Sequence, residues 1–177
     1  MLTLHLPKYV MFDEATSTFP VLPEVDAHFE HSLFSISKWE AKWHQAFLGD
    51  KEKTDAMIAD YLSEMLLDDS IPNLLERLTA KDIDALYSYI SDPQTASVIN
   101  TPPSPEGSSR HSVVTAEVVY TMMIARGIPM ECQYWNFNRL ITLIRVYDVR
   151  MNPGMKMDSK WRMAENARRR KQYHTRG

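Results

Sequence analysis

Apolar and polar residues alternate near the start of the chain, whereas farther along apolar residues recur at helical spacing. Leu2, Leu4 and Leu6 alternate with polar residues, and a second short β run follows at 9–12. A longer alternation places five side chains on one side of a strand: Val25, Ala27, Phe29, His31 and Leu33. The pattern predicts a small antiparallel sheet of two to four strands within residues 1–36, with edges that the prolines leave exposed or irregular.

The most apolar long helix candidate is the stretch 132–151, and we expect the remaining elements to pack around it. Five of its apolar residues fall on one broad helical face: Leu140, Ile141, Leu143, Ile144 and Tyr147. Asn136 is expected to cap the helix, with 129–135 forming a turn before it.

Three further helices are predicted from their N-terminal signals. Ser37 and Glu40 form a potential capping box for a helix over 38–48 that ends at Gly49. Thr54 precedes a helix over 55–67, and Thr79 with Asp82 precedes one over 80–91. The polar side chains of the 55–67 helix, Asp60 and Glu64, are expected to face solvent. The expected inward residues of the 80–91 helix are Ile83, Leu86, Tyr87 and Ile90.

The stretch 111–126 is apolar almost all round, which is typical of a buried helix, and Gly127 suits the position just after its end. Residues 92–111 are rich in proline and predict a long loop or linker within the domain. A last helix is expected over 159–172.

Together these elements predict an α+β, mainly α fold: a small N-terminal antiparallel β-sheet followed by a bundle of five to six helices. The 177 residues are enough for one domain with a sizeable core. We place that domain at 1–157, with 1–36 β-rich and 37–157 helical, and treat 158–177 as a basic C-terminal helix or tail. The single cysteine excludes an internal disulfide, the N-terminus lacks the features of a signal peptide, and no apolar run is long enough to span a membrane.

Charge is distributed unevenly along the chain, whose net charge is −3. Residues 158–177 contain seven Lys or Arg against two acids, whereas residues 50–92 contain eleven acids against four bases. The basic end could therefore contact nucleic acid, an acidic partner or the acidic part of the chain itself. The overall acidic balance argues against sequence-specific nucleic-acid binding.

No motif predicts a catalytic residue, a cofactor or a metal. Three positions separate His28 from His31, so on a strand they point to opposite faces and cannot share an ion. Glu40 and His44 share a helical face, but two ligands are too few for a dedicated metal site. Arg145 and Asp148 are expected to form a surface pair. The glycine-rich phosphate-binding patterns and the nucleophile elbow are lacking, which disfavours an enzyme.

Two features are candidates for partner binding. The first is the stripe Trp39, Trp43 and Phe47, which is either core or an exposed aromatic anchor. The second is the basic run Arg168, Arg169, Arg170 and Lys171, which is either a solvated tail or an electrostatic contact.

Two motifs give a resemblance that covers most of the chain. Residues 31–43 resemble the "HSL-SISKWE-KW" signature of a family of small proteins of long-tailed phages. Residues 128–135 and 138–146 resemble that family's later motif, and the intervening layout and the basic end at 163–168 also fit. The family is that of phage tail assembly chaperones.

The resemblance implies a non-enzymatic protein of the host bacterial cytoplasm. Such chaperones bind the helical tape measure protein, keep it soluble and help recruit tail-tube subunits. Many also exist in a longer, frameshifted form. Homo-oligomerisation along the client would be consistent with this role, and no membrane contact is expected.

Two other functions remain open at this point. One is a structural virion protein, such as a head–tail connector or neck subunit. The other is a nucleic-acid-associated factor that uses the basic C-terminal end.

Overall fold

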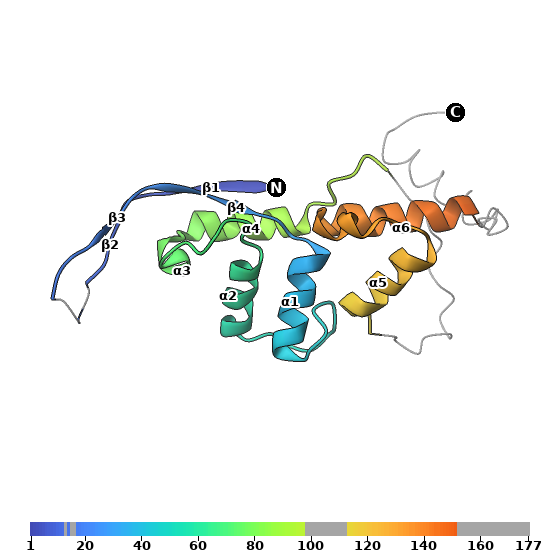
Figure 1. The fold of residues 1–177 in the computed structure, drawn as a ribbon, viewed down its shortest axis with the longest axis horizontal. Coiled ribbons are helices and arrows are strands. Elements are labelled where there is room, and N and C mark those ends of the chain that lie inside the picture. Colours follow the sequence, from blue (N-terminus) through green and yellow to red (C-terminus); the bar gives the residue numbers. More distant parts are fainter. Residues whose placement is uncertain (13, 15–16, 98–112, 152–177) are drawn as a thin grey trace, which may run out of the picture.

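The computed structural model describes residues 1–12, 14, 17–97 and 113–151 of the chain. These residues form an α+β fold, in which a narrow antiparallel ribbon is followed by six α-helices and one 3-10 helix (Figure 1). The predicted fold class is therefore confirmed. The predicted last helix over 159–172 and the basic segment 158–177 lie outside the described residues.

The N-terminal ribbon is built from two consecutive strand pairs. Strands β1 (Leu2–Leu6) and β4 (Val25–Phe29) pair antiparallel, with Leu2 opposite Phe29 and Leu6 opposite Val25. Farther out, β2 (Tyr9–Val10) pairs with β3 (Val21–Leu22). The alternation predicted β1 and the start of β4 correctly. It did not predict β3, the run at 9–12 is a strand only at 9–10, and β4 stops at Phe29, so that Leu33 already belongs to a helix.

Helix α1 (Leu33–Trp43) begins earlier than the sequence predicts. The Ser32 hydroxyl accepts a hydrogen bond from the Ser35 backbone N–H at 3.1 Å, so Ser32 is the N-cap and the predicted capping box at Ser37 is wrong. The helix ends at His44, whose backbone is left-handed with φ 50°, rather than at Gly49. The helical part of the chain thus starts at 33 and not at 37.

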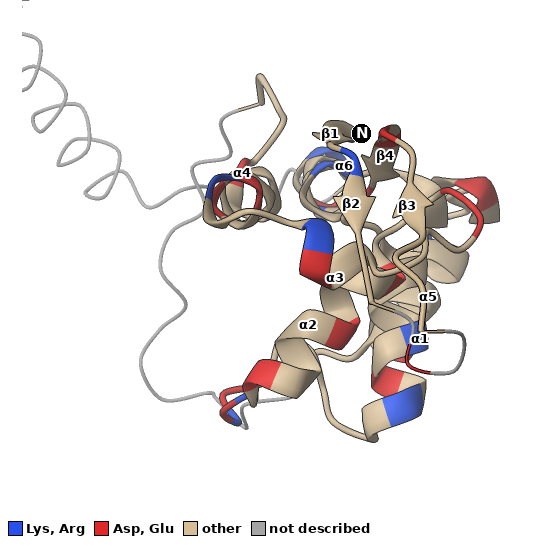
Figure 2. Ribbon diagram, turned by 90° about the vertical axis from the view of Figure 1, so that its left-hand side faces the viewer, with Lys and Arg blue, Asp and Glu red and all other residues tan. Residues whose placement is uncertain are grey.

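Two of the next three helices begin at the predicted caps, although the first of them ends at Glu64 and not at residue 67. Helix α2 (Asp55–Glu64) is capped by Thr54, α3 (Leu74–Arg77) is a single turn, and α4 (Ala80–Ser91) has the complete predicted capping box of Thr79 and Asp82. Six of the eleven acids of residues 50–92 lie on these helices, and the other five lie in the segments between and beside them (Figure 2). Tyr87 is exposed, so its predicted inward position is wrong.

Asp60 and Glu64 of α2 are also less exposed than expected. Asp60 accepts a hydrogen bond from Trp43 Nε1 at 2.7 Å, and Glu64 lies 2.5 Å from the Lys38 ammonium of α1. These two carboxylates therefore link α2 to α1 rather than facing solvent freely.

The last three elements are α5 (Ala116–Ala125), the 3-10 helix η1 (Met130–Tyr134) and α6 (Phe137–Met151). Gly127 ends α5 with φ 63°, and the N–H of Ile128 donates back to the Met123 carbonyl, a Schellman motif as predicted. The side chain of Asn136 accepts from the N–H groups of Asn138 and Arg139, which confirms it as the cap of α6.

Burial of α5 is less complete than its composition predicts. Only one side of the helix packs inward, through Ala116, Val119 and Met123, whereas Ile124 is 70% exposed. An apolar surface is thus left on the outside of α5 that the hydrophobic pattern alone would place in the core.

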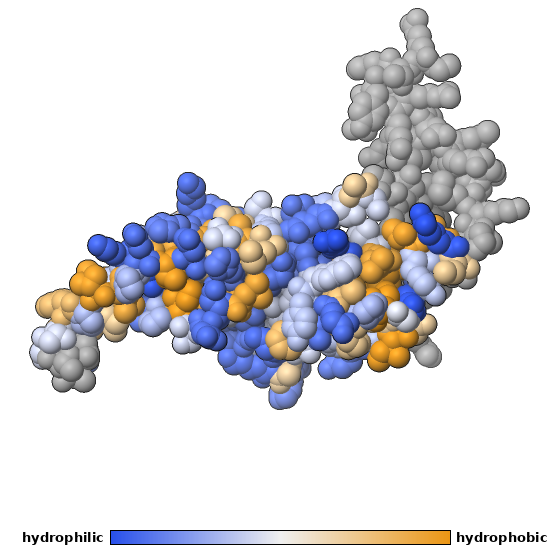
Figure 3. Space-filling model, turned by 45° about the horizontal axis from the view of Figure 1, so that its top comes forward, coloured by the Kyte–Doolittle hydropathy of each residue, from blue (hydrophilic) through white to orange (hydrophobic). Residues whose placement is uncertain are grey.

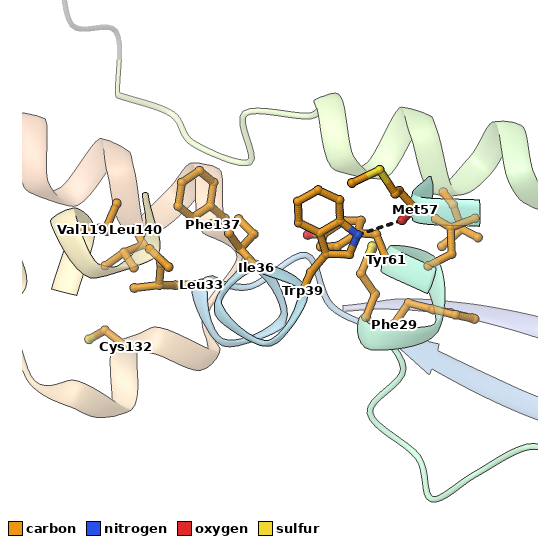
Figure 4. Packing of buried hydrophobic residues seen from close by; sticks show 14 of the residues in the cluster. Phe29, Leu33, Ile36, Trp39, Met57, Tyr61, Val119, Cys132, Phe137 and Leu140 are labelled. Atoms are coloured by element: carbon orange, nitrogen blue, oxygen red, sulfur yellow. Dashed lines mark hydrogen bonds between the residues drawn. The ribbon is translucent and has the colours of Figure 1, made fainter. Parts of the chain in front are cut away.

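The core is centred on α1 and not on α6 (Figure 4). The α1 residues Leu33, Ile36 and Trp39 are almost completely buried. On one side they meet residues of the ribbon and α2, and on the other residues of α5, η1 and α6. Helix α6 covers one side of this core through Phe137, Leu140 and Ile144, while its Leu143 is exposed. The expectation that 132–151 organises the chain is therefore wrong.

Candidate partner-binding surfaces

The predicted aromatic stripe belongs to the core. Trp39 is fully buried, and its indole N–H donates to the Met57 carbonyl at 2.8 Å. Phe47 lies beyond the helix end but packs edge-on against Trp39, with ring centroids 5.3 Å apart, and in a tilted arrangement against Tyr61, with centroids 4.2 Å apart. Trp43 is half-buried. Of the two readings left open for this stripe, the structure supports the core for Trp39, because a fully buried ring offers no surface to a partner.

The basic run Arg168 to Lys171 lies outside the described residues. The structure therefore places none of these four side chains.

The two histidines near the start of α1 have separate surroundings. His28 is paired with Asp68, with Nδ1 and Oδ1 3.0 Å apart. His31 is buried among Phe47, Tyr61 and Phe137, and its Nδ1 is 2.5 Å from the Tyr61 hydroxyl. Burial lowers the pKa of His31 to about 4, and the charge of Glu30 offsets part of that shift. His31 is thus a neutral core residue at physiological pH.

Three polar contacts fix the positions of the helices relative to one another. No sequence pattern indicated these contacts. The buried Glu40 carboxylate accepts from the backbone N–H of Phe47 and of Ala116, both at 2.7 Å, and so ties α5 to α1. The amide of Asn138 donates to the Ile90 and Asp92 carbonyls at 2.8 Å, which joins α6 to the end of α4.

The third contact is a bidentate pair between Arg126 and Asp148, with both N–O distances 2.7 Å. It lowers the pKa of the Asp148 carboxyl and joins α5 to α6. Asp148 therefore pairs with Arg126, and the predicted pair with Arg145 is wrong. The Glu40 carboxylate likewise accepts hydrogen bonds from backbone N–H groups and does not pair with His44. Contacts between residues so far apart along the chain leave no local signal.

Between these contacts lies an apolar groove of about 610 Å³, bounded by the end of α4, by α5 and by α6. We call it the α4–α6 groove. Its apolar lining comprises Leu48, Ile90, Pro93, Val114, Val119, Met122, Phe137, Ile141 and Ile144, and its polar lining comprises Ser91, Asn138, Thr142, Arg145 and Asp148. A concave, mainly apolar site with a few polar groups is the usual form of a binding site.

Arg145 gives the groove a positive charge. Asp148 is already engaged by Arg126, whereas no carboxylate of the described residues lies within ion-pair distance of Arg145. The groove is therefore suited to an apolar segment that also carries a carboxylate.

The second unpartnered surface is the outer end of the ribbon, β2–β3, which projects away from the helices (Figure 1). Its base is fixed by α3: the Arg77 guanidinium donates to the Pro7 and Pro23 carbonyls at 3.0 and 2.7 Å, and the Tyr9 hydroxyl donates to Glu76 at 2.8 Å. Beyond that point the ribbon extends without further support from the described helices.

One face of this projecting ribbon is apolar. Val10 lies opposite Val21, and by alternation Phe12 and Phe19 follow on the same face, with ring centroids 5.1 Å apart. All four side chains are more than half exposed. We call these four residues the arm face. Apolar side chains are visible along this end of the molecule in Figure 3.

Among the residues that the structure covers, no group of three His, Cys, Asp or Glu side chains could hold a metal ion. None of the helices traced is long and apolar enough to cross a bilayer.

Comparison of the chain with protein-family models, with curated proteins and with solved structures returns no match.

Proposed function

We propose that the protein is a non-enzymatic binding protein that holds an apolar helical segment of a partner in the α4–α6 groove. The observation that carries the proposal is the groove itself: an open, mainly apolar hollow of about 610 Å³ whose lining includes Arg145, which has no ion-pair partner among the described residues. An amphipathic helix laid into an apolar groove is a recurrent mode of recognition, and an acidic residue on that helix would pair with Arg145.

The family resemblance supplies the identity of the partner in this proposal. The protein would act as a tail assembly chaperone in the host bacterial cytoplasm, with the phage tape measure protein as its client and the tail-tube protein as a second partner. A long helical client exposes apolar faces that aggregate in water, and a groove of this chemistry would cover them.

Co-expression with the tape measure protein tests the proposal. The client should be insoluble alone and soluble with this chain. Leu48→Asp places a charge on the groove lining and should return the client to the insoluble fraction. The matched control is Leu67→Asp, because Leu67 is also a partly exposed leucine (54% against 46% for Leu48) but does not line the groove.

Two results would contradict the proposal. One is a client whose solubility does not depend on this chain. The other is equal loss of client solubility with both leucine variants. Purified particles provide a further check, since an assembly chaperone should be absent from them, whereas a connector or neck subunit would be retained.

A further inference from the structure

We infer that, when no client is bound, the α4–α6 groove receives the arm face of a second copy of this chain. The client and the second copy would then compete for one site, so the regulatory half of this inference rests on the proposed function. The self-association itself does not.

Both surfaces are left uncovered by the rest of the described chain. A two-stranded ribbon is marginally stable in water, and this one exposes four large apolar side chains on a single face. The groove exposes apolar side chains from three helices. The two surfaces lie in different parts of the molecule: the arm projects at one end, whereas α5 and α6 occupy the other half (Figure 1). The arm face of one copy therefore meets the groove of another copy and not its own.

The two surfaces also carry opposite charges. Glu14 lies in the turn between Phe12 and Phe19, is exposed, and has no ion-pair partner among the residues described. Arg145 is the matching cation on the groove, and it too lacks an ion-pair partner in the part of the chain that the structure describes. The arm thus offers two aromatic rings together with a carboxylate, which is the combination that the groove is suited to receive.

The contact between the two surfaces would be small. An aromatic side chain buries about 150–250 Å² when it is fully covered, and Phe12 and Phe19 are 53% and 67% exposed, so roughly 100–150 Å² of each ring remains to be buried. With the two valines and an equal area on the groove, the contact stays below the roughly 1,200 Å² of a stable interface. The association should therefore be weak and reversible, which suits a site that a client must occupy in turn. Because arm and groove are different surfaces, repeated contacts form chains or rings of copies, or a pair with both arms exchanged.

Sedimentation of the purified full-length protein over a range of concentrations tests the self-association. The average mass should rise with concentration. Phe12→Ser with Phe19→Ser, and separately Leu48→Asp, should each weaken association by about tenfold or more, and Leu67→Asp should leave it unchanged. A wild-type protein that stays monomeric at high concentration would overturn the inference, as would an equal loss with Leu67→Asp.

Charge reversal tests the pairing of the two surfaces. Arg145→Glu and Glu14→Arg should each weaken association, and the double variant should recover it to within about threefold of the wild type, because opposite charges again face each other between copies. Arg150→Glu is the matched control on the same helix, since Arg150 is exposed and does not line the groove. Absence of recovery in the double variant would contradict the contact between Glu14 and Arg145.

Cysteine cross-linking separates this arrangement from an arm-to-arm contact. The only native cysteine, Cys132, is buried, and burial raises the pKa of its thiol, so introduced cysteines react first. A mixture of Glu14→Cys and Arg145→Cys copies should cross-link, whereas each alone should not. Cross-linking of Glu14→Cys alone would show two arms in contact and overturn the inference.

The same cross-link measures competition. It should be suppressed in the soluble complex with the tape measure protein. If the cross-link forms but the client is not solubilised, the self-association stands and the proposed function fails. If the client binds through the groove while the free protein remains monomeric, the proposed function stands and the self-association fails.

Discussion

The aromatic cluster around α1 and the arm face of β2–β3 are built from the same kind of residue, yet their environments are opposite. Both contain a pair of rings with centroids about 5 Å apart: Trp39 with Phe47 at 5.3 Å and Phe12 with Phe19 at 5.1 Å. Trp39 is fully buried, whereas Phe12 and Phe19 are 53% and 67% exposed. The difference lies in what covers each pair.

Around α1, the buried polar side-chain atoms of the described residues have partners, and the apolar side chains are covered. The Trp39 indole N–H reaches the Met57 carbonyl, and His31 reaches the Tyr61 hydroxyl. On the arm face, none of the described residues supplies such cover. Stability is therefore concentrated at α1, and the arm is free to bind. Two adjacent aromatic rings therefore do not by themselves show whether a region belongs to the core or to a binding surface.

The largest expected effect comes from truncating the covered ring. Trp39→Ala should lower the free energy of unfolding by about 3–5 kcal/mol, because it leaves a cavity and removes the indole hydrogen bond to the Met57 carbonyl. Urea unfolding followed by far-UV circular dichroism measures this change. A loss below about 1 kcal/mol would mean that the two regions do not differ as described.

Acidification should weaken the core and leave the arm unaffected. The pKa of His31 is lowered to about 4 from an ordinary 6.5, so between these values the unfolded chain binds a proton that the folded chain does not. Stability due to neutral His31 is complete above about pH 6.5 and is lost as the pH falls toward 4, by about 3 kcal/mol in total.

Unfolding measured across this pH range, with His31→Gln beside it, checks the expectation. The variant should lose the slope between pH 6.5 and 4, even if it is less stable throughout. His44→Gln, at the exposed end of α1, is the control and should keep the slope. Parallel curves for the wild type and His31→Gln would contradict the assignment.

The smallest expected effect on stability is that of Phe12→Ser with Phe19→Ser. Because both rings are largely exposed, the free energy of unfolding at low protein concentration should change by no more than about 0.5 kcal/mol per residue. Urea titrations at micromolar concentration measure it. A loss comparable to that of Trp39→Ala would mean that the arm is covered within one copy and is not a binding surface.

Local signals predicted a large part of the fold. The alternation at 2–6 and 25–29, the caps at Thr54 and Thr79, the Asn136 cap and the turn at Gly127 each depend on residues within a few positions of one another. The start of α1 was missed because Ser32 and Ser37 are both acceptable caps locally. The helix is capped by Ser32, close to the end of β4. At this point the Phe137 N–H donates to the His31 carbonyl at 2.7 Å, and this bond brings α6 against the start of α1.

The α4–α6 groove could not be predicted from local sequence signals in the same way. Its lining comes from residues 48 to 148, and its walls are positioned by contacts such as Glu40 with Ala116 and Arg126 with Asp148. The aromatic stripe was identified, but only packing decides whether a stripe is covered. Leu48 and Met122 carry no pattern that separates a groove residue from a core residue.

The sequence by itself therefore determined which segments become strands and helices, since caps, turns and hydrophobic periods act over a few residues. The tertiary structure decided that α1 and not α6 is the centre of the core. It also decided which apolar faces remain open, at the arm and in the α4–α6 groove. Burial is a property of neighbours that are distant in sequence, and the hydrophobic effect drives apolar surface together without specifying which surfaces meet.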